Sequence, residues 1–452
     1  MKWSMKKPCL SGRQVCLLFI SFFFLSVVIQ AQPTPEVAAN IKTNKKIMDG
    51  FMDLRFGMFI HWGPVTLRGT EIGWSRGNQV PVEEYDNLYK EFDPVLFNAD
   101  EWVKTAKDAG MKYLTITAKH HDGFCLWPTA FTNHNIMHSQ YKKDIVGELA
   151  NACKKQGIKF CIYFSVLDWY DPNYPLHLPG QKEIDPKANM DKFVNTTMKG
   201  ELKELVTRYH PYMLWFDGNW EKPWTQEDAV EIYNFLKHLD PNVIINNRLG
   251  KGEHTEMTST SVGDYATPEQ KIGALNMKDP WETCMTICQQ WAWKPNDKMK
   301  SLKECIQTLA KTSGGNGNLL FNVGPMLDGR MEARQIERLK EMGDWLKIYG
   351  ESIYDTKGGP YAPNDTFATT RKGNKLFVHL FSNKTGSLQL PGLTGIKVLA
   401  AHFIGGAKVS FSQQANGGVL ISLPAQLPDE NDAVIELKLD SNAENIPVIA
   451  MD

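Results

Sequence analysis

Short apolar runs alternate with amphipathic segments over residues 50–350 of this 452-residue chain. Apolar runs of roughly four to eight residues closed by a turn residue are typical of strands buried on both faces. Segments with apolar residues every three or four positions are typical of helices packed on such strands. The pattern predicts strands at 56–61, 111–118, 158–165, 212–217, 243–247, 283–287 and 318–323. It predicts helices at 100–110, 144–156, 193–208, 227–239, 302–312 and 331–349.

This alternation predicts an α/β fold of parallel strands joined by crossover helices. Candidate reactive side chains follow many of the strands, whereas an open sheet gathers its site at one crevice. We therefore expect a (β/α)8-type, TIM-like barrel over residues 40–352. After Gly350, strand-like segments separated by Gly, Pro, Asn and Asp predict a small C-terminal antiparallel β-sandwich over residues 353–452.

The first residues have the pattern of an export signal. Lysines and Arg13 precede an apolar run at 15–29, and Ala31 leads into polar sequence. This order predicts a signal peptide over residues 1–31 and a protein that is exported, to the periplasm or outside the cell. A retained membrane anchor is the alternative, but the run is somewhat short for a bilayer span. We expect no stable membrane insertion after the signal is removed.

Charge and cysteine content narrow the class of protein. Lys and Arg (50) nearly balance Asp and Glu (51), which gives a formal net charge of −1. Without a basic block to neutralise phosphates, nucleic acid is not an expected partner. The six cysteines after the signal lack the spacing of a zinc site, so we expect most of them to be buried free thiols.

One apolar run ends in a carboxylate. Residues 211–216 are followed by Asp217 and Gly218. An acid at the carboxyl end of a buried parallel strand lies where α/β proteins place their active sites. An isolated Asp would more often cap the next helix, but the pattern recurs at other strands of this chain.

Other polar side chains follow the remaining strands. His61 ends the first strand and His120-His121 follows the second, while Tyr163 lies in the third and Arg248 follows the fifth. Imidazoles can hydrogen-bond sugar hydroxyls or bind a metal ion. The guanidinium is a fixed fork of donors that suits hydroxyls and a ring oxygen. Together these residues predict a site at one rim of the barrel.

At these residues the chain resembles the retaining α-L-fucosidases of glycoside hydrolase family 29. Five motifs occur in the family's order and span roughly residues 50–330: FGMFIHWG at 56–63, KHHDGF at 119–124, WFDG at 215–218, WETCMT at 281–286 and NLLFNVGP at 318–325. The resemblance implies a barrel with a C-terminal β-sandwich. It also implies a fucosylated oligosaccharide or glycoconjugate as substrate and no metal or organic cofactor.

Residue by residue, the resemblance makes Asp217 the nucleophile. Six residues match family positions that hold the fucose: His61, His120, His121, Tyr163, Trp215 and Arg248. Trp74 matches a tryptophan that follows an acid in the family, but here the acid is Glu71, two residues further away. Glu71 and Trp74 are therefore also expected at the substrate site.

The general acid/base varies in position across the family. The candidates are Glu221, Glu253, Glu256, Asp264, Glu269 and Glu282. Residues 263–269 resemble the loop that carries the acid in several members, so Glu269 is the expected acid/base; otherwise it is an exposed loop carboxylate. Glu282 belongs to a stronger motif, but its place on an expected strand suits a buried supporting role at the substrate site. It stays the alternative.

The resemblance implies an exo-acting retaining α-L-fucosidase that hydrolyses terminal α-L-fucosyl residues by double displacement through a covalent fucosyl-enzyme. One alternative is a metal-dependent barrel hydrolase that uses three histidines and Asp217; the need for Arg248 at the same site argues against it. The other is a non-catalytic carbohydrate-binding relative, against which the intact Asp217 motif argues.

Overall fold

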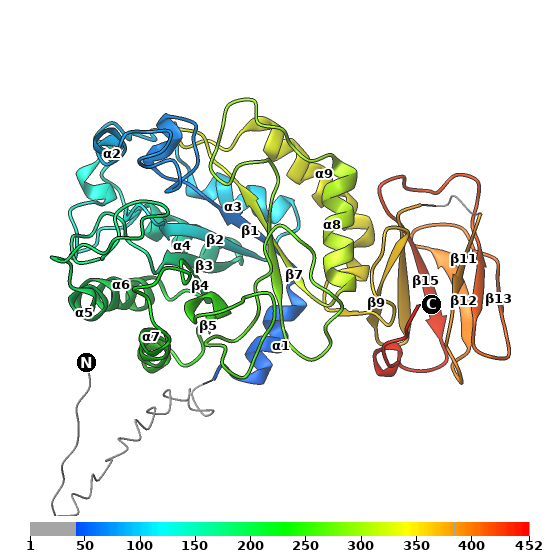
Figure 1. Ribbon diagram of the computed structural model, residues 1–452. Helices are drawn as coiled ribbons and strands as arrows, with labels where there is room; N and C mark the ends of the chain where they lie inside the picture. Colours follow the sequence, from blue (N-terminus) through cyan, green and yellow to red (C-terminus); the bar gives the residue numbers. More distant parts are fainter. Residues whose placement is uncertain (1–41, 383–385, 452) are drawn as a thin grey trace, which may run out of the picture. The chain divides into compact units, whose positions relative to one another are not determined.

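The computed structural model describes residues 42–382 and 386–451, so the expected signal peptide lies outside the described residues. Strands and helices alternate in the first region (Figure 1). The strands of its parallel sheet are β1 (Phe56–Ile60), β2 (Tyr113–Lys119), β3 (Lys159–Ser165), β4 (Met213–Asp217), β5 (Ile244–Ile245), β6 (Glu282–Thr286) and β7 (Asn318–Val323). The α-helices are α1 (Lys45–Asp53), α2 (Val82–Tyr85), α3 (Ala99–Asp108), α4 (Ile145–Gln156), α5 (Met190–Lys192), α6 (Lys199–Tyr209), α7 (Gln226–Leu239), α8 (Leu302–Gly314) and α9 (Ala333–Tyr349).

The parallel sheet curls into a barrel that an irregular segment closes. Its strand order is β5-β4-β3-β2-β1-β7-β6. Residues 264–270 fill the gap between β5 and β6: the Asn247 N–H donates to the Tyr265 carbonyl and the Glu282 N–H to the Ala266 carbonyl, each at 2.9 Å. The barrel expected from the sequence is confirmed, with this segment in place of an eighth regular strand.

Local chemistry explains why the closing segment, residues 264–270, is irregular. Pro268 has no N–H to donate to a ladder. Gly263 has φ +149°, and a Cβ there would lie 2.5 Å from the Asn246 carbonyl oxygen, so only glycine allows this approach. The Asp264 carboxylate accepts the Ile245 N–H at 2.9 Å, in the place of a backbone acceptor. The regular part of β5 is accordingly two residues long, shorter than the expected strand at 243–247.

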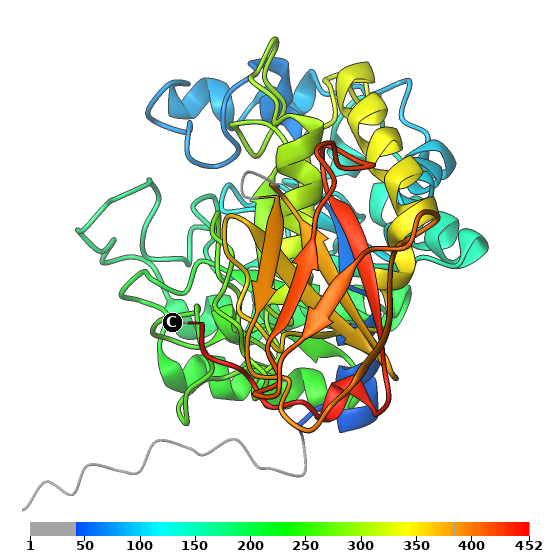
Figure 2. The same cartoon turned by 90° about the vertical axis from the view of Figure 1, so that its right-hand side faces the viewer.

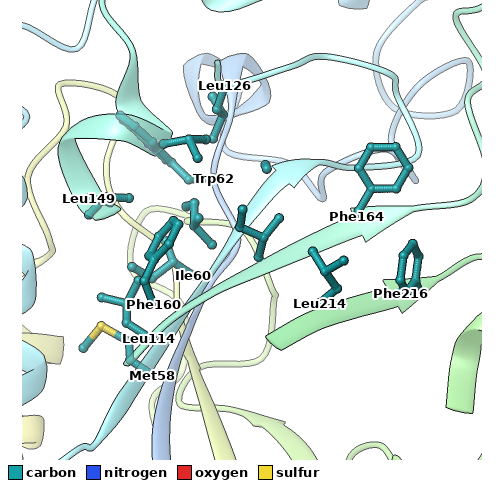
Figure 3. Close-up of a cluster of buried hydrophobic side chains, with 14 of the residues drawn as sticks. Met58, Ile60, Trp62, Leu114, Leu126, Leu149, Phe160, Phe164, Leu214 and Phe216 are labelled. Atoms are coloured by element: carbon teal, nitrogen blue, oxygen red, sulfur yellow. The ribbon is translucent and has the colours of Figure 1, made fainter. Parts of the chain in front are cut away.

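Alternate residues of the strands point to opposite faces of the sheet. Outward-pointing side chains such as Met58, Leu114 and Phe160 belong to one buried cluster with Leu149 of α4 (Figure 3). Each such side chain contributes about 1.5–3 kcal/mol when fully buried. This outer core fixes the helices on the sheet.

The inward-pointing side chains form a separate aromatic cluster inside the barrel. The Trp215 ring stacks on Tyr163, with centroids 5.6 Å apart, and meets Phe59 at 5.2 Å. Tyr113 fits across β1 because Gly57 has no side chain: a Cβ there would lie 2.3 Å from the tyrosine ring. The barrel interior is therefore packed solid below its carboxyl-end rim.

A carboxylate lies within this aromatic interior. Glu282 is fully buried and accepts hydrogen bonds from Trp215 Nε1 at 3.1 Å, the Tyr113 hydroxyl at 2.5 Å and the Tyr265 hydroxyl at 3.3 Å. Burial raises the pKa of Glu282 to about 7, although the three donors act in the opposite direction. Its contacts tie β2, β4, β6 and the closing segment together at the barrel axis.

The C-terminal region contains two antiparallel sheets (Figure 2). Their strands are β8 (Lys357–Gly358), β9 (Phe367–Lys372), β10 (Lys375–Leu380), β11 (Ser387–Leu390), β12 (Val398–Phe403), β13 (Phe411–Gln413), β14 (Val419–Ser422) and β15 (Ala433–Leu439). Side chains of both sheets, among them Val378 and Ile421, share one core, which confirms the expected β-sandwich. The Gln307 side chain of α8 donates to the Asn431 carbonyl at 2.8 Å, a direct link to the barrel. The boundary at residue 352 stays a prediction.

Two further features concern the described residues alone. The six cysteines at 125, 153, 161, 284, 288 and 305 are buried free thiols, as the sequence predicts. Within 42–382 and 386–451, no helix has the length and apolar character needed to cross a membrane.

Removal of the Asp264 carboxylate is expected to destabilise the protein strongly. Asp264 accepts from the buried Lys237 ammonium at 3.1 Å and the Tyr233 hydroxyl at 2.9 Å. Asp264→Ala leaves that ammonium without its counter-ion, which should cost about 3–5 kcal/mol of unfolding free energy in urea titrations. Asp365→Ala, which removes the exposed partner of Lys311, is the control and should cost less than about 1 kcal/mol. Equal costs would contradict the expectation.

The raised pKa of Glu282 predicts a pH-dependent stability. The folded protein keeps a proton on Glu282 up to about pH 7, whereas the unfolded chain releases it near the ordinary value of 4.5. The contribution of Glu282 to stability therefore falls as the pH rises through this window. Glu282→Gln cannot titrate, so the unfolding free energy of the wild type minus that of the variant should fall by up to about 1.4 kcal/mol per pH unit. Urea titrations of both proteins at about pH 5, 6 and 7 measure this difference in unfolding free energy. A difference that does not change with pH would contradict the raised pKa of Glu282.

Candidate active site

A cavity of about 420 Å³ opens at the carboxyl ends of the barrel strands. Its walls mix aromatic side chains with a few polar groups, as in sites for small molecules. The lining residues are Phe59, His61, Glu71, Ile72, Trp74, His120, Tyr163, Trp215, Asp217, Trp220, Arg248, His254, Glu269, Cys284 and Trp291. Nine of the eleven residues expected at the site from the sequence are in this set; His121 and Glu282 are not.

Asp217, the last residue of β4, lies beside two hydrogen-bond donors and a histidine ring. Arg248 Nη1 donates to Oδ1 at 3.1 Å and the Tyr163 hydroxyl donates to Oδ2 at 3.1 Å. His121 Nε2 lies 3.7 Å from Oδ2. Burial on its own would raise the pKa of Asp217, but Arg248, His121 and Tyr163 outweigh it and lower the pKa below its ordinary value. Asp217 is thus held as an anion.

The Arg248 guanidinium joins the two candidate carboxylates. Besides Asp217, it donates through Nη2 to Glu269 Oε2 at 2.9 Å and through Nε to the Thr267 hydroxyl at 3.1 Å. Its centre lies 4.8 Å from the Trp215 ring centroid, a cation–π contact. The structure therefore brings Glu269 of the closing segment into the same cavity as Asp217.

The carboxylates differ in exposure. The Glu269 side chain is 38% exposed and that of Asp217 15%. A carboxyl at the cavity mouth can exchange protons with solvent, whereas one below it is shielded. This difference suits an acid/base at Glu269 and a permanent anion at Asp217.

Two buried histidines have one ring nitrogen fixed by the fold. His61 Nδ1 lies 2.6 Å from the Asn322 side-chain oxygen, because the Asn322 amide donates its N–H to the Trp291 carbonyl at 2.8 Å. His121 Nδ1 lies 2.7 Å from the Ser165 hydroxyl. The Ser165 hydroxyl donates its own proton to the Leu167 carbonyl at 2.8 Å, so Nδ1 of each histidine is the donor and Nε2 is left as an acceptor. Burial lowers the pKa of His61 to about 3 and that of His121 to about 4, so both rings are neutral.

His120 is held by stacking instead. Its ring lies parallel to Tyr163, with centroids 5.3 Å apart and an interplanar angle of 6°. Nδ1 makes no hydrogen bond to the described residues. Burial, with His121 and His61 close by, lowers the pKa of His120 well below the ordinary value. The ring is therefore a neutral group in the cavity wall with hydrogen-bonding capacity to spare.

Glu71 lines the cavity but its carboxylate is already bound. The backbone N–H groups of Trp291 and Ala292 donate to it, each at 2.9 Å. Burial raises the pKa of Glu71, and these amide donors oppose the change. Glu71 thus joins the loop after β1 to the loop after β6. Its expected contact with substrate stays a prediction.

Two tryptophans form the rim. Trp74 and Trp220 are 41% and 45% exposed, and their rings stack with centroids 5.8 Å apart. Trp74 also meets His121 and the buried Trp169 at their edges. An exposed aromatic pair beside a polar cavity is a surface suited to the apolar face of a sugar or to another flat group.

The other candidate acids lie elsewhere. Glu282 is beneath the cavity, below Trp215, and three donors enclose its carboxylate; its expected supporting role at the substrate site stays a prediction. Asp264 pairs with Lys237, and Glu221 accepts from Trp169 and Tyr174. Glu253 and Glu256 are exposed and are not among the residues that line the cavity.

The metal-binding alternative lacks a ligand set in the described residues. Among residues 42–382 and 386–451, no three His, Cys, Asp or Glu side chains form a group that could hold a metal ion. The histidines and Asp217 named in that alternative contact Asn322, Ser165, Tyr163 and Arg248 instead.

Sequence reasoning missed several lining residues, chiefly Phe59, His254, Trp220 and Trp291. Trp220 follows Asp217 by three positions, so its nearness to a strand end was a usable signal. Trp291 had none. It reaches the cavity only because Glu71 and Asn322, both distant in sequence, bind its backbone.

Comparisons with known proteins identify one family. A family model described as alpha-L-fucosidase matches residues 23–351. The tissue alpha-L-fucosidase of Macaca fascicularis is 32% identical over 456 residues, which cover 93% of this chain and 94% of the relative. The human tissue alpha-L-fucosidase is 31% identical, over 92% of this chain and 94% of the relative.

Solved structures give the same result. Alpha-L-fucosidase isoenzyme 1 from Paenibacillus thiaminolyticus superimposes with a TM-score of 0.78 at 33% identity, over 88% of this chain and 99% of its own. A family 29 alpha-L-fucosidase from Bacteroides thetaiotaomicron was trapped as a covalent intermediate in complex with 2-fluoro-fucosyl fluoride. It superimposes with a TM-score of 0.80 at 29% identity, over 88% of this chain and 97% of its own. This chain belongs to the α-L-fucosidase family of glycoside hydrolases.

Proposed function

We propose that this α-L-fucosidase removes terminal fucosyl residues by double displacement, with Asp217 as nucleophile and Glu269 as acid/base. One observation carries the proposal: Arg248 donates to both carboxylates in one cavity, at 3.1 and 2.9 Å. Retaining glycosidases need such a pair, about 5–5.5 Å apart, so that one attacks while the other handles the proton. The covalent intermediate of the Bacteroides thetaiotaomicron relative is consistent with this chemistry.

The shape of the cavity favours exo action. Phe59 and Trp215 belong to the aromatic cluster that fills the barrel below, so the cavity has a closed floor. A volume of about 420 Å³ accommodates a single sugar ring with part of its neighbour, rather than a chain that passes through. The substrate is therefore expected to present a terminal fucose.

In the first step, a carboxylate oxygen of Asp217 attacks the anomeric carbon. The bond to the aglycone oxygen breaks with its electron pair, and Glu269 gives that oxygen its proton. In the second step, Glu269 takes a proton from water, whose oxygen displaces Asp217 from the anomeric carbon. Fucose leaves with its configuration retained, and both carboxyls return to their starting states.

The neutral imidazoles orient the sugar. With Nδ1 fixed by Asn322 or Ser165, His61 and His121 each offer Nε2 as an acceptor for a fucose hydroxyl. Neutral rings bind hydroxyls without competing with Arg248 for the charge of Asp217. Their contribution is orientation: the sugar loses its freedom of movement on binding, so less entropy is lost on the way to the transition state.

Loss of the nucleophile should abolish turnover. Asp217→Ala removes the attacking oxygen, so kcat on an aryl α-L-fucoside should fall on the order of 10⁴-fold. Asp365→Ala, a surface change, should keep normal rates. For the wild type, proton NMR of the first product should show α-fucose before mutarotation. A β-anomer as first product would contradict double displacement.

Loss of the acid/base should be partly rescued. Glu269→Ala should reduce kcat/KM by about 10²–10⁴-fold on a fucoside with a poor leaving group and less on one with a good leaving group. Azide should accelerate this variant and give fucosyl azide, because it needs no general base to attack the intermediate.

Glu282→Gln is the matched control for that experiment. It should show no response to azide, since Glu282 lies under Trp215 rather than in the cavity. Azide rescue of a Glu282 variant, together with near-normal activity of Glu269→Ala, would move the acid/base role to Glu282.

A further inference from the structure

A second hollow, of about 610 Å³, adjoins the active-site cavity. Glu71 and Trp291 line both spaces, so the two spaces are direct neighbours. We call this second hollow the outer groove. Gln270, Gln289, Lys298 and Lys300 are among the other residues that line it. The outer groove has no role in the steps described above.

The outer groove lies on the side of Glu269. Gln270 follows Glu269 directly and has a left-handed backbone conformation, with φ +52°. Its N–H donates to the Cys284 carbonyl at 3.0 Å and its side chain to the Thr286 hydroxyl at 3.2 Å. A non-glycine residue keeps such a conformation only where contacts of this kind hold it. The turn places Glu269 in the active-site cavity and Gln270 in the outer groove.

We propose that the outer groove is an aglycone subsite that binds the sugar to which the fucose is attached. This inference rests on the proposed function. The general acid must meet the oxygen between fucose and aglycone, so the aglycone lies beside Glu269. The outer groove is lined by Gln270, the residue after Glu269, and shares Glu71 and Trp291 with the active-site cavity.

The groups that line the groove suit a hydroxyl-rich ring. Trp291 contributes an aromatic face shared with the cavity. Lys298 and Gln289 are exposed. Within the described parts of the chain, no residue forms an ion pair or hydrogen bond with the Lys298 ammonium or the Gln289 side chain, so both can bind ligand. Glu71 and Lys300, by contrast, are engaged by backbone groups. The ligand class is a hexose or N-acetylhexosamine of a glycan.

The exposed pair of Trp74 and Trp220 is the competing location. Trp220 lies three residues beyond Asp217, and Trp74 stacks on it. Trp220 follows the nucleophile along the chain, whereas Gln270 of the outer groove follows the acid, which meets the leaving group. We therefore assign the aglycone to the outer groove, and Trp220 serves to test the choice.

The experiment compares two substrates. Fucosylated disaccharides with α1,2, α1,3, α1,4 and α1,6 linkages identify the one that the wild type hydrolyses best, and 4-nitrophenyl α-L-fucoside is the reference. The double variant Gln289→Ala/Lys298→Ala should lose about tenfold in kcat/KM on the disaccharide, the effect of two lost hydrogen bonds. On the aryl fucoside it should change less than about twofold, which also checks that it is folded.

Two further variants complete the experiment. Lys294→Ala removes an exposed lysine of the same loop that does not line the groove, and should leave the preference unchanged. A selective loss of disaccharide activity in Trp220→Ala but not in the double variant would overturn the proposal. So would a double variant with an unchanged preference, or a wild type that hydrolyses no disaccharide.

The failures are distinguishable. A wild type that hydrolyses the aryl fucoside, with a preference that the double variant does not alter, rejects the subsite and leaves the proposed function intact. A wild type inactive on every fucoside rejects both.

Discussion

The buried guanidinium of Arg248 is the interaction on which the site depends. A charge in this position requires a counter-charge, which Asp217 supplies from the end of β4, while Glu269 of the closing segment accepts a second hydrogen bond from the same guanidinium. The planar fork of arginine donates in fixed directions, so it sets the carboxylates relative to each other as well as attracting them. Trp215 packs on its face and Thr267 accepts from Nε. A lysine could not hold this arrangement, because its single ammonium lacks the fork.

Support for the guanidinium extends into the barrel. The Trp215 indole N–H donates a hydrogen bond to Glu282, and the hydroxyls of Tyr113 and Tyr265 donate to the same carboxylate. The buried acid therefore anchors the ring under Arg248 without entering the cavity. Its position explains how a carboxylate in a strong motif can matter for the site without contact with the sugar. The electrostatic pattern above it is simple: neutral imidazoles surround one stabilised anion.

The irregular closing segment links the fold to the proposed chemistry. A regular eighth strand would alternate its side chains strictly between barrel interior and exterior. The bend around Pro268 and the left-handed Gln270 instead direct Glu269 to the cavity and its successor to the outer groove. Asp264 fixes the start of this segment on Lys237. The stability of the closure and the position of the acid therefore have a common origin.

The sequence by itself determined the barrel strands, the C-terminal β-sandwich and the residues at strand ends, such as His61 and Asp217. Apolar runs fix where strands lie, and parallel strands bring their carboxyl ends to one rim. Tertiary structure decided the rest. The closing segment has no strand pattern, Trp291 reaches the cavity through distant partners, and Glu282 turned out to lie beneath it. Whether a loop carboxylate such as Glu269 meets Arg248 depends on how the barrel closes, because loops take their positions from contacts that are remote in sequence.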